Sequence, residues 1–133
     1  MATNNKKPSV LIIDDNEMTR SLLRSIIQGD AYDVVGEASN GVTGLERTFK
    51  LSPDIVCLDI SMPDMNGLEV LLEIKKELPQ TVVLMVTASN DIETVQQAIK
   101  NGASGFIVKP FVLGTVLDTL GNAVQKLNAL KSL

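Results

Sequence analysis

The chain has 133 residues, a length that fits one domain with a single sizeable core. Its 12 basic and 16 acidic residues give a formal charge of -4, which provides no broad positive field for nucleic acid or an anionic membrane, so we expect proteins or cations as partners. Histidine is absent, which excludes serine–histidine and cysteine–histidine nucleophile pairs, histidine-ligated zinc sites and a phosphohistidine donor within this chain.

Short apolar runs alternate with segments of helical periodicity along the whole chain. Glycine and proline punctuate them, with Gly29, Pro53 and Gly102 ending helices and Asn90 or Asp91 capping one. In chain order, we expect strands at 10–13, 34–38, 55–58, 82–86 and 105–108, each followed by a helix, at 17–28, 41–51, 68–78, 92–100 and 113–130.

Three of the expected helices carry apolar residues at helical spacing, the pattern of a face that packs on a sheet. These residues are Met18, Leu22, Leu23, Ile26 and Ile27 in the first helix, Val42, Leu45 and Phe49 in the second, and Leu117, Leu120, Val124, Leu127 and Leu130 in the last. For the last helix we expect core packing first and an interface only second. Cys57, Met18 and Met85 are also assigned to packing.

Strands that alternate with helices through short turns predict an α/β fold, a parallel sheet covered on both faces through right-handed crossovers. The five-stranded form commonly has the strand order 2-1-3-4-5, the flavodoxin-like, doubly wound (βα)5 arrangement. In that order, the first and third strands are neighbours at the switch point where ligands bind.

Polar residues follow the apolar runs at this edge of the predicted sheet. Asp14 and Asp15 follow the first strand and Asp59 follows the third, while Thr87 and Lys109 follow the fourth and fifth. Three carboxylates gathered there would repel one another unless a cation or a transferred group lay between them. For Asp15 or Asp59 taken alone, a solvated loop residue or a helix cap is the favoured interpretation, and Lys109 alone could be a surface lysine.

Four stretches together resemble the receiver domain of bacterial two-component response regulators, in its single-domain, chemotaxis-regulator-like form. They are LIIDDN at 11–16, DIVCLDISMPDMNG at 54–67, MVTAS at 85–89 and GASGFIVKPF at 102–111. The resemblance covers about residues 9–130, which leaves 1–8 as a polar N-terminal tail and no separate output domain.

The resemblance implies a role for each residue at the sheet edge. Asp59 is the expected phosphoacceptor, and Asp14, Asp15, Asp59 and the backbone carbonyl of Ser61 form the expected site for Mg²⁺, with Mn²⁺ as the alternative. Asp15 is the expected direct ligand, and Asp14 is expected to hold a coordinated water. Lys109 supplies positive charge to the phosphoryl group, and the bond to Pro110 resembles the family's cis peptide.

The resemblance also implies a switch. Thr87 is expected to move inward on phosphorylation, and Phe106 to turn into the space that it leaves, which changes the face formed by the fourth helix, fifth strand and fifth helix. Ser61 and Ser89 occupy positions that tune the lifetime of the phosphoryl group, and the small Ala88 leaves room for it. The plainer interpretation of Phe106 is a core ring.

The implied partners are a sensor histidine kinase or phosphotransfer protein upstream and a protein target downstream, with no nucleic acid and no membrane. We expect a monomer or weak dimer. Cys57 is the single cysteine, so an intrachain disulfide is excluded, and the opening MATNNKKPS has no apolar signal core. A cytoplasmic location is expected from these features.

Other functions stay open at this point. A Mg²⁺-dependent phosphohydrolase with an aspartyl-phosphate intermediate is one, although haloacid-dehalogenase-like phosphatases place a second acid where this chain has Ser61. A flavin carrier and a docking module that never receives phosphate are the others. The expected role is signalling rather than enzymatic turnover.

Overall fold

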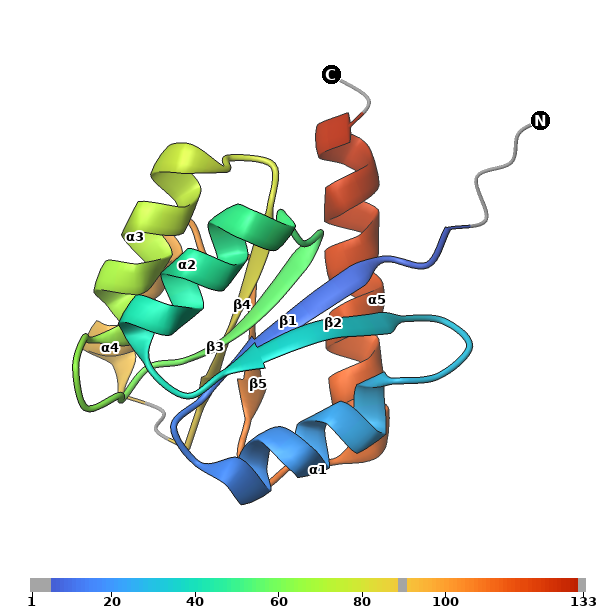
Figure 1. Cartoon of the computed structure of the whole chain (residues 1–133), viewed down its shortest axis with the longest axis horizontal. Coiled ribbons are helices and arrows are strands. Elements are labelled where there is room, and N and C mark those ends of the chain that lie inside the picture. The colour runs from blue at the N-terminus through green and yellow to red at the C-terminus, as the bar shows by residue number, and fades with distance from the viewer. Residues whose placement is uncertain (1–5, 89–90, 132–133) are drawn as a thin grey trace.

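Five strands alternate with five helices in the computed structural model, which describes residues 6–88 and 91–131 (Figure 1). In chain order these elements are β1 (Ser9–Ile13), α1 (Glu17–Ile27), β2 (Asp33–Ala38), α2 (Gly41–Leu51), β3 (Ile55–Asp59), α3 (Gly67–Glu77), β4 (Val82–Thr87), α4 (Ile92–Lys100), β5 (Gly105–Val108) and α5 (Leu113–Lys131). All strand pairs are parallel and the sheet order is β2-β1-β3-β4-β5, as the sequence predicts.

The two faces of the sheet are covered by different helices. On one face, Val10 and Ile12 of β1 belong to the cluster that includes buried residues of α1 and α5 (Figure 1). On the other face, Leu11 and Ile13 join buried residues of α3 and α4. The central strands β3 and β4 are buried over their whole length. This two-sided burial explains why their sequences are continuous apolar runs instead of alternating ones.

Polar side chains fix where the helices begin. Asn16, Asn40, Asn66 and Asp91 each accept a backbone N–H in the first turn of α1, α2, α3 and α4. Of the two caps proposed for α4, Asp91 is therefore confirmed, whereas Asn90 lies outside the described residues. Each cap satisfies an amide that has no partner within its helix.

Several apolar residues assigned to packing are exposed instead. Met18 is 82% exposed and Leu22 is 52% exposed, so the prediction that they pack in the core is wrong for both. In α2, Val42 and Phe49 are exposed, and the buried face is formed by Gly41, Gly44 and Thr48. The physical reason is close approach, because a Cβ added at Gly44 would lie 2.8 Å from Ile13 Cδ1.

The last helix packs largely as expected. Leu120 and Leu127 are buried, and Val124 and Leu130 are partly buried against the same cluster. Leu117 is 39% exposed, and the neighbouring Val116 takes the buried position. Cys57 and Met85 are fully buried, which confirms their packing roles. None of the helices in the described part of the chain is long and apolar enough to cross a lipid bilayer.

Candidate functional site

The sheet order brings three carboxylates together. Asp14 directly follows β1 and Asp59 ends β3, and these strands are paired with Ile13 opposite Leu58. One carboxylate oxygen from each of Asp14, Asp15 and Asp59 lies within 4.8 Å of the others. Asp14 and Asp59 are buried whereas Asp15 is exposed, so the cluster reaches solvent through Asp15.

Lys109 brings its ammonium group into the same cluster. Its Nζ lies 3.4 Å from Asp14 Oδ2 and 3.8 Å from Asp59 Oδ1. Its backbone N–H donates to the carbonyl of Thr87 at 2.9 Å, which extends the pairing of β5 with β4, and the Lys109–Pro110 peptide bond is cis. The side chain therefore faces two buried acids, which an ordinary surface lysine would not do.

The contacts of Asp14 leave one oxygen facing the cluster. Its backbone N–H donates to the carbonyl of Ala38 at 3.0 Å, and its Oδ1 accepts the N–H of Asn16 at 2.8 Å. Its Oδ2 is buried and makes no hydrogen bond within the described residues. A buried charged oxygen without a hydrogen bond is costly, and a cation nearby reduces that cost.

Burial and charge act together on Asp59. Burial, with the neighbouring charges of Asp14 and Asp15, raises the pKa of this carboxyl from 3.8 to about 6, against the lowering effects of Lys109 and a backbone hydrogen bond at Ser61. The ionised form is thus disfavoured in the absence of another positive charge. A divalent cation among these hard oxygen donors would relieve the repulsion, so the residues present fit Mg²⁺.

Asp15, Asp59 and Lys109 line an open cleft. Ser61, Thr87 and Ala88 border it as the sequence predicts, and Thr87 is buried at the end of β4. Phe106 is partly buried, lies opposite Met85 in the sheet and packs against the cluster on the α3 and α4 face. Ser89 lies outside the described residues.

The cleft has further lining residues that no sequence pattern assigned to it. They are Asn16 and Thr19 at the start of α1, Ile60 after β3, and Thr94 on α4. Asn16 could have been noticed, because it directly follows the acid pair. Thr94 is distant in sequence from every other lining residue except Thr87 and Ala88, and its position depends on where α4 lies, so no local signal marks it.

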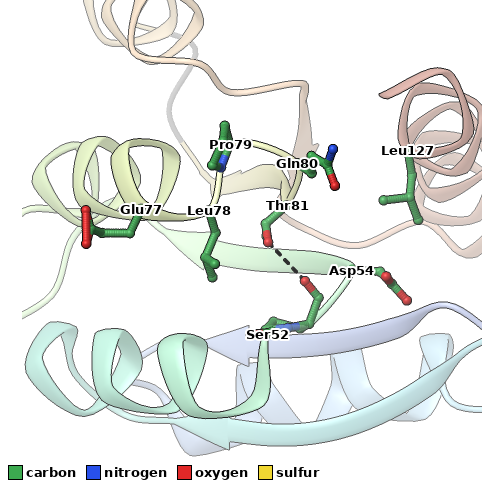
Figure 2. Close-up of a pocket in the computed structure, with 9 residues that line it drawn as sticks. Ser52, Asp54, Glu77, Leu78, Pro79, Gln80, Thr81 and Leu127 are labelled. Atoms are coloured by element: carbon green, nitrogen blue, oxygen red, sulfur yellow. Dashed lines mark hydrogen bonds between the residues drawn. The ribbon is translucent and has the colours of Figure 1, made fainter. Parts of the chain in front are cut away.

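A second pocket lies at the opposite, amino-terminal end of the strands, drawn in Figure 2. Two of its polar side chains are engaged with the protein. Thr81 Oγ1 donates to the carbonyl of Pro53 at 3.1 Å (Figure 2). Asp54 Oδ2 accepts the backbone N–H of Ser9 at 2.9 Å. No paired acids and no lysine–carboxylate contact occur among the described residues that line it. The carboxyl end of the sheet is therefore the better candidate site.

Comparison with known proteins agrees with this geometry. The family model described as "Response regulator receiver domain" matches residues 10–120. The chain is 44% identical over 117 residues to the chemotaxis protein CheY of Thermotoga maritima, which covers 88% of this chain and 97% of that protein.

Solved structures show the same fold. The response regulator domain of Thermotoga maritima CheB has a TM-score of 0.81 at 34% identity and covers 92% of this chain and 98% of that one. The REC domain of AraT, a response regulator from Geobacillus stearothermophilus, has a TM-score of 0.86 at 26% identity, with coverage of 95% and 99%.

Proposed function

Since this chain belongs to the response regulator receiver domain family, we propose that it is a phosphoacceptor of two-component signal transduction, with Asp59 as the residue that takes the phosphoryl group. The observation that carries the proposal is the set of three carboxylates within 4.8 Å of one another, with the Lys109 ammonium beside two of them. In this role the chain acts as a signalling protein, and residues 9–130 are the receiver domain behind a polar tail at 1–8.

The proposed metal is Mg²⁺, and Mn²⁺ would suit the same oxygen ligands. The carboxylates of Asp15 and Asp59 and the backbone carbonyl of Ser61 are the proposed direct ligands, while Asp14 holds a coordinated water. When bound, the cation supplies positive charge that offsets the negative charge of the equatorial phosphoryl oxygens. The same charge lowers the repulsion between Asp59 and its acidic neighbours.

In the proposed reaction, a carboxylate oxygen of Asp59 forms a bond to phosphorus while the bond from phosphorus to the donor breaks. With a phosphohistidine donor, the imidazole nitrogen keeps the electron pair of the broken bond. The product is an acyl phosphate. Lys109 lies 3.8 Å from Asp59 Oδ1 and is positioned to offset charge on the transferred group, while the Thr87 hydroxyl donates a hydrogen bond to one of its oxygens.

The proposed output is a change of the face formed by α4, β5 and α5. Thr87 ends β4 beside the cleft, and Phe106 lies on the neighbouring strand, partly buried, so inward movement of the hydroxyl makes room for the ring. These elements and the loop before α5 carry exposed apolar side chains, which suits a protein target: Ile99, Val108, Val112, Leu113 and Leu117. Phosphorylation then biases an existing equilibrium between two arrangements of this face.

The proposed partners are a sensor histidine kinase or a phosphotransfer protein as donor and a protein as target, with the chain acting as a monomer or weak dimer in the cytoplasm. No nucleic acid or membrane takes part in this scheme. The proposed lifetime-tuning positions are Ser61, at the edge of the cleft, and Ser89.

Incubation with Mg²⁺ and acetyl phosphate or phosphoramidate, followed by intact-protein mass spectrometry, tests the proposal. We expect one added phosphoryl group, lost in the variant Asp59→Asn and lost when EDTA removes the metal. The matched control is Asp118→Asn, which changes an exposed acid on α5 and should keep the adduct.

The other candidate functions give different results in the same assay. Continuous turnover of generic phosphate esters would identify a phosphohydrolase. A chain that takes no phosphoryl group from either donor and binds its target equally with and without them would be a docking module.

A further inference from the structure

A cluster of charged side chains lies behind the acidic site, between β2 and α1. Glu37 of β2 accepts from two arginines of α1, with Arg20 Nε at 3.1 Å from Oε1 and Arg24 Nη1 at 2.6 Å from Oε2. The side chain of Arg20 is 16% exposed and that of Arg24 43%. Arg20 is thus the more enclosed of the two partners.

Arg20 makes a second contact that Arg24 does not share. Its Nη1 donates to the backbone carbonyl of Asp14 at 2.7 Å while its Nε holds Glu37. This carbonyl belongs to the peptide group that joins Asp14 to Asp15. One rigid guanidinium therefore links the end of β2 to the peptide between two of the proposed metal-site acids.

The link completes the restraint of Asp14. The N–H of Asp14 is held by Ala38, which follows Glu37 on β2, and Asp14 Oδ1 is held by Asn16, so Arg20 fixes the remaining backbone group. With these three contacts in place, Asp14 Oδ2 is directed to Lys109 at 3.4 Å. Loss of the Arg20 contact frees the Asp14–Asp15 peptide plane to rotate, which moves the carboxylate of the exposed Asp15.

Charge and shape explain why arginine suits this position. Glu37 pairs with the Arg20 guanidinium and offsets part of its positive charge, although the same carboxylate is shared with Arg24. The planar guanidinium presents two N–H donors in a fixed geometry, whereas the ammonium of lysine cannot reproduce that fork.

We infer that Arg20, held by Glu37, is a positioning residue that sets the Asp14–Asp15 peptide for Mg²⁺ binding. The inference rests on the proposed function, because it concerns the same metal site. Residues that orient metal ligands without touching the metal typically change metal affinity about 10-fold to 100-fold when removed, and we expect a loss in that range for Arg20→Ala.

The test is Mg²⁺ titration by isothermal calorimetry on the whole chain. Arg24→Ala is the matched control, because it also removes an arginine from Glu37 but has no contact with Asp14. We expect wild-type affinity for Arg24→Ala, a loss of about 10-fold or more for Arg20→Ala, and only partial recovery for Arg20→Lys, which keeps the charge but not the fork. In the metal-free protein, the amide NMR signal of Asp15 should broaden in Arg20→Ala and stay sharp in Arg24→Ala.

The outcomes separate this inference from the function on which it rests. If the wild-type chain binds Mg²⁺ and Arg20→Ala binds it equally well, Arg20 does not position the site. Equal losses in Arg20→Ala and Arg24→Ala would also overturn the inference, since the effect would then come from Glu37 or from α1 as a whole. A wild-type chain that binds no Mg²⁺ would instead overturn the proposed function and the inference together.

Discussion

The charge of Asp59 should destabilise the metal-free protein at neutral pH. Burial, Asp14 and Asp15 raise the pKa of this carboxyl from 3.8 to about 6, and a change of that size corresponds to about 3 kcal/mol in favour of the protonated form in the folded state. The folded protein therefore binds the proton more tightly than the unfolded chain. Between pH 3.8 and about 6, the free energy of unfolding should therefore fall as the pH rises.

The substitution Asp59→Asn removes the charge and keeps the shape. In EDTA at a pH well above 6, we expect this variant to unfold with a free energy up to about 3 kcal/mol higher than that of the wild type, and below pH 3.8 we expect the gain to vanish. Urea unfolding followed by circular dichroism at the two pH values measures both quantities. Asp118→Asn, an exposed acid on α5, is the control that should show no such gain.

A metal adds a second arm to this experiment. Mg²⁺ stabilises the folded state by an amount that increases with its affinity, so it should stabilise the wild type more than Asp59→Asn. A gain from Asp59→Asn that is the same at both pH values, or a variant less stable than the wild type at high pH, would refute the argument that burial and the neighbouring acids together disfavour the ionised form of Asp59.

Three further predictions concern the frame around the site. A Cβ at Gly67 would lie 2.2 Å from the backbone oxygen of Asp59, so Gly67→Ala should lower the free energy of unfolding by about 2 kcal/mol or more. The control Gly121→Ala, whose Cβ would have nothing within 4 Å, should cause no such loss, and urea unfolding that ranks the two variants the other way would contradict this prediction. Asp64 accepts the backbone N–H groups of Gly41 and Val42 at 2.8 and 2.9 Å, and its pKa is lowered. Asp64→Ala should therefore lower the Tm at neutral pH, and the Tm difference from the wild type should shrink as the pH falls below 3.8. An equal Tm difference at neutral and at low pH would contradict this prediction. Burial raises the pKa of the Cys57 thiol to about 12, so Ellman's reagent should react with it only at the rate of unfolding, and fast reaction in native buffer would disprove its burial.

Much of the fold could be predicted from local sequence patterns. Continuous apolar runs mark strands buried on both faces, and the residues directly after them meet at one edge once the sheet order is known. These two rules predict that Asp14, Asp59 and Lys109 lie at the same edge of the sheet, and the structure places them together.

The parts that sequence missed depend on contacts between elements. Helical periodicity shows which side chains share a face but not how closely the helix approaches the sheet, so α2 buries Gly44 instead of Val42 and Phe49. The contacts of Arg20 with Glu37 and with the Asp14 carbonyl join a strand and a loop that no spacing rule connects. A pairing of that kind is visible only in three dimensions.

The most direct test of the phosphoacceptor proposal is to map the phosphorylated residue chemically. After reaction with phosphoramidate and Mg²⁺, borohydride reduces an aspartyl phosphate to homoserine, and peptide mass spectrometry locates that residue. We predict homoserine at position 59, formed with Mg²⁺ and absent in EDTA. Homoserine at another position, or equal amounts with and without the metal, would contradict the assignment of Asp59 and its acidic neighbours.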